Sequence, residues 1–196
     1  MRWHVAGILS VAICLSLDGG PVQAGSKADG GPPVGHSGVI GGEDYTSLID
    51  WGCNYSRSKT RISYHFRDVT TRYQTATYQA REAWNDSLSV PHFYGTGSTS
   101  ADFNVYDAEY QSNDWWAWVV HDCSSTHVSK KYMHWNAMAG LSSSMRAKID
   151  MHEMGHIYGL RHDDDPCGGP TIMGPNVTNC AANITWRDYS AVNYIY

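Results

Sequence analysis

The sequence lacks any apolar run of the roughly 20 residues that a helix needs to cross a bilayer. Its apolar stretch at residues 5–17 is too short, and no later segment approaches that length. Basic residues form no block, and the 196 residues carry a formal net charge of −5. We therefore expect no membrane anchor and no nucleic-acid partner. No internal repeat is visible either.

The N-terminus has the layout of a signal peptide. Arg2 precedes the apolar stretch, and Val22-Gln23-Ala24 provides a cleavage site before Gly25, so residues 1–24 are expected to be removed and the protein secreted to the extracellular space. Gly, Pro and Ser are frequent from residue 25 onward, and we expect residues 25–57 to form a flexible leader or short propeptide. Residues 58–196 are long enough to form one domain with a core.

Cysteine is scarce, with five residues in the whole chain. One of them, Cys14, is removed with the signal peptide. The even number that remains in an oxidising compartment favours disulfides, but four cysteines allow three pairings and the sequence does not choose among them. The remaining cysteines are Cys53, Cys123, Cys167 and Cys180.

Hydrophobic periodicity predicts strands alternating with helices. Ile62, Tyr64 and Phe66 alternate as in a strand, and the apolar residues that follow recur with a helical period. The predicted strands cover residues 62–66, 90–94, 103–106, 115–121 and 131–137, and the predicted helices cover residues 73–88, 142–158 and 184–194.

One short stretch concentrates residues that bind metals and activate water, HEMGHIYGLRH at residues 152–162. His152 and His156 are four residues apart, so a helix places both imidazoles on one face, where they can bind the same ion. Glu153 follows the first of them, and its carboxylate is turned away from coordination and toward a water held by the metal. That is the position of a general base.

A third ligand requires the chain to turn back after this helix. Gly159 can adopt a positive φ, so the helix can end there and return His162 to the metal. Three protein ligands leave one tetrahedral position open for water, as in catalytic zinc sites, whereas structural sites are usually closed by four. If His162 points away, the third ligand would come from Asp163, Asp164 or Asp165. This acidic run would otherwise be a solvated loop or a calcium site.

The pattern HExxHxxGxxH, followed by a turn that contains methionine, resembles the signature of the metzincin clan of zinc metallopeptidases. The turn reads TIMGP at residues 171–175, and the resemblance implies that Met173 lies under the metal as an apolar floor without binding it. The order of segments and the cysteines around the turn are most similar to the small secreted proteases called snapalysins. Snapalysins have aspartate as third ligand, whereas His162 followed by Asp163 is similar to reprolysins, and the Met-Gly-Pro turn is similar to matrixins.

The resemblance implies an α+β, zincin-like fold. A twisted, mostly parallel five-stranded sheet with an antiparallel edge strand would lie above an active-site helix, and a small C-terminal subdomain would hold the Met turn and a terminal helix. By position the edge strand carries Trp115, Trp116 and Trp118, which would wall the substrate cleft or, as the alternative, pack on the sheet.

The resemblance also implies a disulfide between Cys167 and Cys180, which bracket the Met turn, and with it one between Cys53 and Cys123. A Cys53 thiolate bound to the zinc is the alternative for that residue.

These observations predict a secreted, monomeric zinc endopeptidase that cleaves proteins or peptides. Zinc would polarise the scissile carbonyl and activate its bound water, with Glu153 as the base. A thermolysin-like enzyme is disfavoured because no glutamate follows Glu153 to supply a third ligand. The alternative of a different class is a secreted binding protein with a catalytically silent metzincin-like fold, although all three histidines, Glu153 and Met173 are present.

Overall fold

A computed structural model describes residues 39–40, 43–50, 54–89, 91–108, 116–124, 127–136, 140–163, 171–175, 177 and 180–196. For residues 39–40, 43–44, 108, 121–124 and 127–136 it describes the backbone alone. The predicted signal peptide lies outside the described residues, and so does the predicted leader as far as residue 38. The boundaries at residues 24 and 57 stay predictions.

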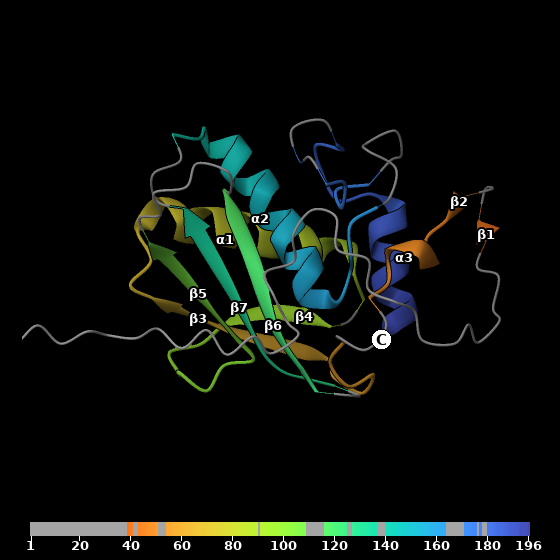
Figure 1. The fold of residues 1–196 in the computed structure, drawn as a ribbon, viewed down its shortest axis with the longest axis horizontal. Coiled ribbons are helices and arrows are strands. Elements are labelled where there is room, and N and C mark those ends of the chain that lie inside the picture. Colours follow the sequence, from red (N-terminus) through yellow and green to blue (C-terminus); the bar gives the residue numbers. More distant parts are fainter. Residues whose placement is uncertain are drawn as a thin grey trace, which may run out of the picture.

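A mixed sheet runs through the middle of the molecule (Figure 1). It is parallel except for one edge strand, which pairs antiparallel with its neighbour. In spatial order its strands are β4 (His92–Gly95), β3 (Arg61–Arg67), β5 (Phe103–Ala108), β7 (His127–Asn136) and the antiparallel β6 (Ala117–Ser124). The prediction of a mixed fold with a mostly parallel sheet is confirmed. The predicted strand bounds at residues 115–121 and 131–137 differ by one to four residues from those of β6 and β7.

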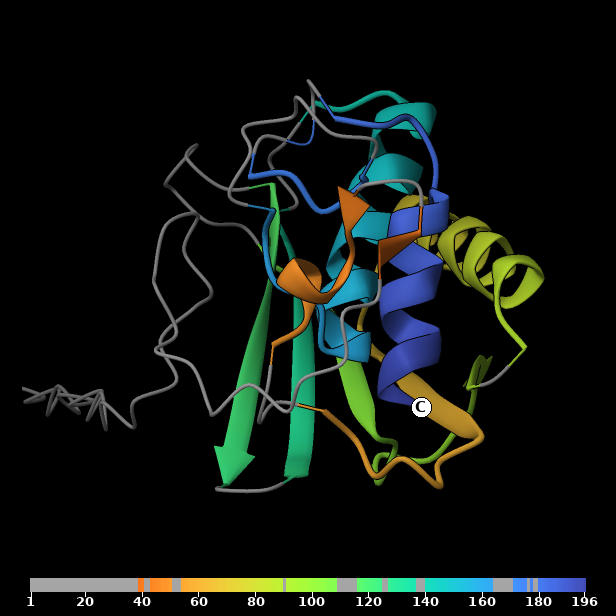
Figure 2. The ribbon, with the colours of Figure 1, turned by 90° about the vertical axis from the view of Figure 1, so that its right-hand side faces the viewer.

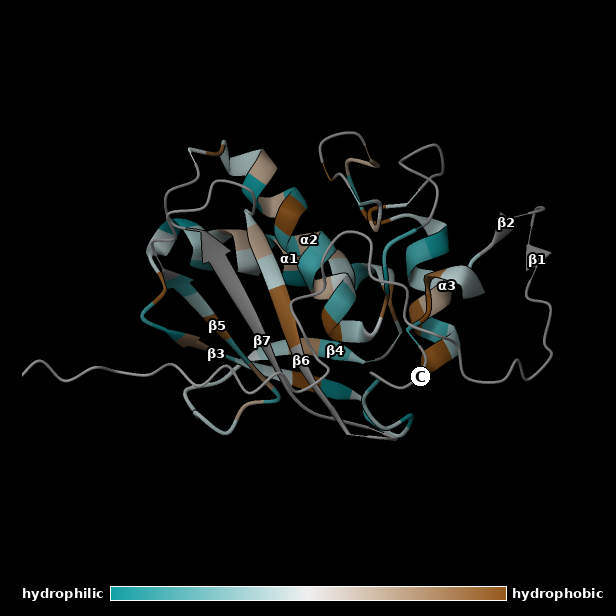
Figure 3. Cartoon of the chain, viewed as in Figure 1, coloured by the Kyte–Doolittle hydropathy of each residue, from teal (hydrophilic) through white to brown (hydrophobic). Residues whose placement is uncertain are grey.

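Two helices cover one face of this sheet, as the two views together show (Figures 1 and 2). The first is α1 (Thr71–Ser87), which buries Tyr73, Ala80 and Trp84 along one side because these residues recur at helical spacing. The second is α2 (Ser143–Tyr158), which packs against α1. Hydrophilic and hydrophobic positions both occur along α2 (Figure 3), which is unusual for a helix in the interior. The polar positions of α2 include the candidate site residues.

Local sequence signals set both ends of α2. At its start the Ser142 hydroxyl accepts a hydrogen bond from the Met145 N–H at 3.2 Å, which satisfies one of the free donors of the first turn. At its end Gly159 adopts φ 102° and ψ 25°, a left-handed conformation that glycine reaches without steric cost. The predicted helix and its predicted end are both confirmed.

The C-terminal helix α3 (Trp186–Ile195) is also confirmed, and it lies beside the C-terminal end of α2 (Figure 2). The Asp188 carboxylate accepts hydrogen bonds from the N–H and the hydroxyl of Thr185, each at 2.8 Å, which fixes the first turn of α3. Among the described residues, no helix is long and apolar enough to span a bilayer.

Residues 45–50, at the end of the predicted leader, are packed against the rest of the protein, while the expected boundary at residue 57 stays a prediction. Two short strands, β1 (Val39–Ile40) and β2 (Glu43–Asp44), pair antiparallel and lead into the 3₁₀ turn η1 (Thr46–Leu48). Tyr45, Leu48 and Ile49 are buried in the hydrophobic core. The spacing of three and four residues between these apolar side chains is helical and indicates a packed segment. The Gly, Pro and Ser content upstream favoured a flexible leader instead.

Candidate metal centre

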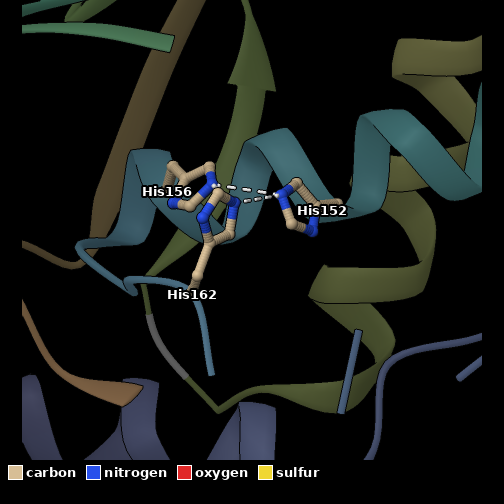
Figure 4. Close-up of side chains that lie close together, drawn as sticks. All are labelled: His152, His156 and His162. Atoms are coloured by element: carbon tan, nitrogen blue, oxygen red, sulfur yellow. Dashed lines mark hydrogen bonds between the residues drawn. The ribbon is translucent and has the colours of Figure 1, made fainter. Parts of the chain in front are cut away.

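Three imidazoles converge at the C-terminal half of α2 (Figure 4). The Nε2 atom of His152 lies 3.1 Å from that of His156 and 3.1 Å from that of His162, and the third distance is 3.2 Å. His152 and His156 come from the helix and are buried, while His162 comes from the loop after Gly159 and is half-buried. The predicted ligand set is therefore brought together, with His162 pointing toward the other two.

The hydrogen bonds of the outer ring nitrogens identify the inner ones as lone-pair donors to a metal. Nδ1 of His152 lies 2.8 Å from the Ile172 carbonyl oxygen, and Nδ1 of His156 lies 2.7 Å from that of Leu160. A carbonyl oxygen only accepts, so each Nδ1 carries the ring hydrogen and each Nε2 presents a lone pair. Two such lone pairs 3.1 Å apart cannot share a hydrogen bond and repel each other, unless a cation lies between them.

The size of the cluster fits a tetrahedral ion. Zinc bound at about 2.0–2.1 Å to three imidazoles would hold their nitrogens about 3.3–3.4 Å apart, which is close to the observed separations. Three neutral nitrogen donors also suit copper, iron or nickel, so the donor set by itself could hold a metal ion without naming which one.

Burial keeps these histidines in the form that binds metal. The pKa of His152 is lowered to about 3, first by burial and then by the neighbouring His162, and this outweighs the opposite effect of the Ile172 carbonyl. Burial likewise lowers the pKa of His162. Both rings are therefore neutral near pH 7, and binding an ion requires no loss of a proton.

Glu153 lies on α2 between the two helical ligands and is itself buried. Burial, and to a lesser extent the charge of Asp150, raises the pKa of its carboxyl to about 8. A divalent cation beside it would lower that value again. A carboxyl whose pKa lies near the working pH is suited to accept and return a proton.

A second buried carboxyl on α2 was not singled out from the sequence. Asp150 is fully buried and its Oδ2 lies 2.6 Å from the Thr77 hydroxyl of α1, while its Oδ1 has no hydrogen-bond partner among the described residues. Burial raises its pKa to about 8, and the Thr77 hydrogen bond opposes this. Its sequence signal was an acidic residue between the apolar Ile149 and Met151.

Met173 lies directly against α2. Its predicted role as the floor of a zinc site stays a prediction. Met173 is fully buried, and a Cβ atom added to Gly155 would come within 2.3 Å of the Met173 sulfur. Gly155 stands between the two helical ligands, so the methionine contacts the helix at the level of the metal centre. The glycine is required by this close approach and not by the conformation of the helix.

Asp188 holds the turn that carries Met173. Its carboxylate accepts hydrogen bonds from the Thr171 hydroxyl and, at 3.1 Å, from the Ile172 N–H. The Ile172 carbonyl in turn faces the Nδ1 atom of His152. Asp188 therefore links the start of α3 to the orientation of a metal ligand, a role that sequence spacing did not reveal.

The aspartate beside the third histidine is not a ligand in this structure. Asp163 forms a buried ion pair with Arg187 of α3 at 2.6 Å, and its N–H donates to the Met173 carbonyl at 2.8 Å. The expectation of an aspartate ligand or calcium site does not hold for Asp163, because its carboxylate is engaged by the guanidinium. Asp164 and Asp165 lie outside the described residues.

The other predicted site residues are only partly described. Trp116 and Trp118 are half-buried, and Trp116 packs against the core, which fits the packing alternative for that residue. Trp115 lies outside the described residues, so the role of the three tryptophans as a cleft wall stays a prediction. Cys180 is disulfide-bonded. Cys53, Cys167 and the side chain of Cys123 are outside the described part, and the pairing stays a prediction.

Two comparisons with known proteins gave no match. No family model matches the chain. No curated protein matches it either. The function is therefore argued from the fold and from the geometry of the metal centre.

Proposed function

We propose that the protein is a secreted zinc-dependent endopeptidase of the metzincin type. The observation that carries the proposal is the convergence of three imidazole Nε2 atoms. Two of these imidazoles lie on the helix that carries Glu153, and Met173 packs against that helix. Three protein ligands leave a coordination position for a water or a substrate, which structural zinc sites lack.

The residues divide the chemistry among themselves. His152, His156 and His162 hold the ion, which when bound polarises a carbonyl and lowers the pKa of water. Glu153 accepts the proton of the attacking water and returns it to the leaving amine. Burial raises the pKa of its carboxyl, and a bound divalent cation would lower it, so the two effects oppose each other in the loaded site.

The sheet supports a protein or peptide as the substrate. β6 is an edge strand that pairs antiparallel with β7, so its other edge can receive an extended peptide as a further strand. A peptide bound in this way presents its backbone to the metal centre without requiring one particular side chain. We propose that the protein acts outside the cell, which rests on the signal-peptide prediction. We also propose that it acts as a monomer.

The experiment that tests the function is casein cleavage by the secreted protein, with and without a zinc chelator. Glu153→Gln is the matched variant, because it keeps the shape of the side chain and removes the base. Cleavage should stop with the chelator and fall by at least about a hundredfold in the variant. The variant should still bind one zinc per chain, because Glu153 is not a ligand. A zinc-loaded wild type that cleaves nothing would favour the binding-protein alternative.

A further inference from the structure

The segment that precedes the predicted catalytic domain contacts the loop that carries the third histidine. We call residues 45–50 the strap. It contains η1, and Leu48 and Ile49 are fully buried in the core. In Figure 2 η1 lies beside the C-terminal end of α2 and beside α3, so the strap reaches the metal-bearing end of the helix.

Backbone hydrogen bonds join the strap to the first half of the loop. The Asp50 N–H donates to the Gly159 carbonyl at 2.8 Å, and the Arg161 N–H donates to the Leu48 carbonyl at 2.7 Å. Between these two bonds Ile49 and Leu160 form an antiparallel bridge. The loop is thus paired like a strand just before it reaches His162.

Side chains strengthen the same connection. The Arg161 Nε donates to the Ser47 carbonyl at 2.6 Å, and Arg187 of α3 donates to the Ser47 hydroxyl at 3.3 Å. Arg187 also holds Asp163, the residue after the third histidine. The strap therefore secures the loop before His162, and α3 secures it after His162.

The third ligand depends on this arrangement more than the other two do. His152 and His156 have the hydrogen-bonded backbone of a helix, whereas Gly159 ends that helix and the following residues are irregular. An irregular loop keeps a side chain in one place only if its backbone is tied to other elements. The described ties before His162 include both backbone bonds of the strap.

We propose that the strap is a positioning segment for the third metal ligand, and that any maturation cleavage falls before Tyr45. The proposal rests on the proposed function for the identity of the ion. It places the boundary before residue 45 instead of at residue 57, because a cut between residues 45 and 57 would break the chain that joins the strap to the rest of the domain and leave it held by noncovalent contacts alone.

The test removes one strap contact in the secreted protein. Asp50→Pro deletes the N–H that donates to the Gly159 carbonyl and puts the proline ring against that oxygen. Ile49 has φ −86° and ψ 125°, which is already a conformation that suits a residue before proline. Asp50→Ala is the matched control, because it loses the same carboxylate and keeps the N–H.

Two measurements are made on each protein: zinc affinity by competition with a chelator, and the melting temperature of the metal-free form. The strap proposal predicts zinc affinity at least about tenfold weaker for Asp50→Pro than for Asp50→Ala, a loss typical of supports behind metal ligands. A melting transition of the proline variant above the assay temperature then shows that the measured zinc affinity belongs to a folded protein. Equal zinc affinity in the two variants would overturn the strap proposal alone, whereas a wild type that binds no zinc would overturn the proposed function and the strap proposal with it.

Sequencing the N-terminus of the active secreted protein tests the second half of the proposal. We expect it to begin at or before Tyr45. A fully active enzyme that begins after Asp50 and binds zinc like the longer chain would contradict the proposal.

Discussion

The helix that supplies two of the metal ligands and the loop that supplies the third are built in different ways. α2 begins at a serine cap and ends at a left-handed glycine, and its two histidines face one way because they are four residues apart. His162 follows the helix in irregular backbone, and its loop is held by residues that lie far away in the sequence. Local rules thus place two ligands, and tertiary contacts place the third.

The largest effect is expected from breaking the ion pair behind the loop. Arg187→Met should leave the Asp163 carboxylate buried without its partner and lower the free energy of unfolding by about 3–5 kcal/mol. Zinc affinity should fall as well, because Asp163 follows the third ligand. Urea unfolding and zinc competition measure the two effects. Arg187→Lys, which keeps the charge, should lose less, and equal losses in both variants would assign the effect to the shape of the guanidinium.

A smaller effect is expected at the contact between the helix and the Met turn. Gly155→Ala improves the helix propensity but puts a methyl group against the Met173 sulfur, so overpacking should lower the free energy of unfolding by about 1–3 kcal/mol. Zinc affinity should fall because the turn also orients His152. Gly140→Ala is the control, because a Cβ there would meet nothing within 4 Å. A Gly155→Ala protein as stable as the control would show that Met173 moves freely.

The two helix caps sharpen the comparison further. Ser142→Ala removes the cap of α2, and Thr185→Ala removes the hydrogen bond from the Thr185 hydroxyl to the Asp188 carboxylate, so each should cost about 1 kcal/mol in thermal or urea unfolding. Only Thr185→Ala should also weaken zinc binding, because the Thr185 hydroxyl helps to hold the Asp188 carboxylate that supports the Met turn. Equal zinc affinity in the two variants would mean that the hold on the Met turn does not affect zinc binding.

The smallest effect is a dependence of stability on pH. Burial, opposed by hydrogen bonds from Thr171, Thr185 and Ile172, raises the pKa of Asp188 above its ordinary value of 3.8. The folded chain therefore keeps this proton at pH values where the unfolded chain has lost it. The contribution of Asp188 to the free energy of unfolding should be greatest below that ordinary value and fall as the pH rises through the raised folded pKa.

Urea unfolding of the metal-free protein between about pH 4 and 7 measures this contribution as the difference between wild type and Asp188→Asn. In Asp188→Asn the free energy of unfolding should lack the decline with pH that Asp188 causes, whatever the absolute stability of the variant. Parallel pH profiles for the two proteins would mean that Asp188 titrates alike in the folded and unfolded chains.

The same division explains which parts of the structure could be predicted from the sequence. The ends of α2 and the facing pair of histidines follow from nearby residue types, and the described geometry confirms both. The return of His162 was predicted from Gly159, but the distant contacts that hold its loop were not. The alternating strands and helices were predictable from periodicity, although the bounds of β6 and β7 were not.

The supports of the site could not be predicted because they join distant residues. Asp163 pairs with a residue 24 positions away, and Ser47 contacts a residue 140 positions away. Single-sequence patterns contain no information on such pairs. The strap had one readable signal, the apolar spacing of Tyr45, Leu48 and Ile49, but composition upstream of it pointed to a leader.

The central claim is that three histidines bind one zinc ion and leave a position open. X-ray absorption at the zinc edge, on protein loaded with one equivalent, tests it most directly. We predict three imidazole nitrogens and one further light atom at about 2.0–2.1 Å. A sulfur ligand, a fourth protein ligand, or no binding of zinc by the folded protein would contradict the account.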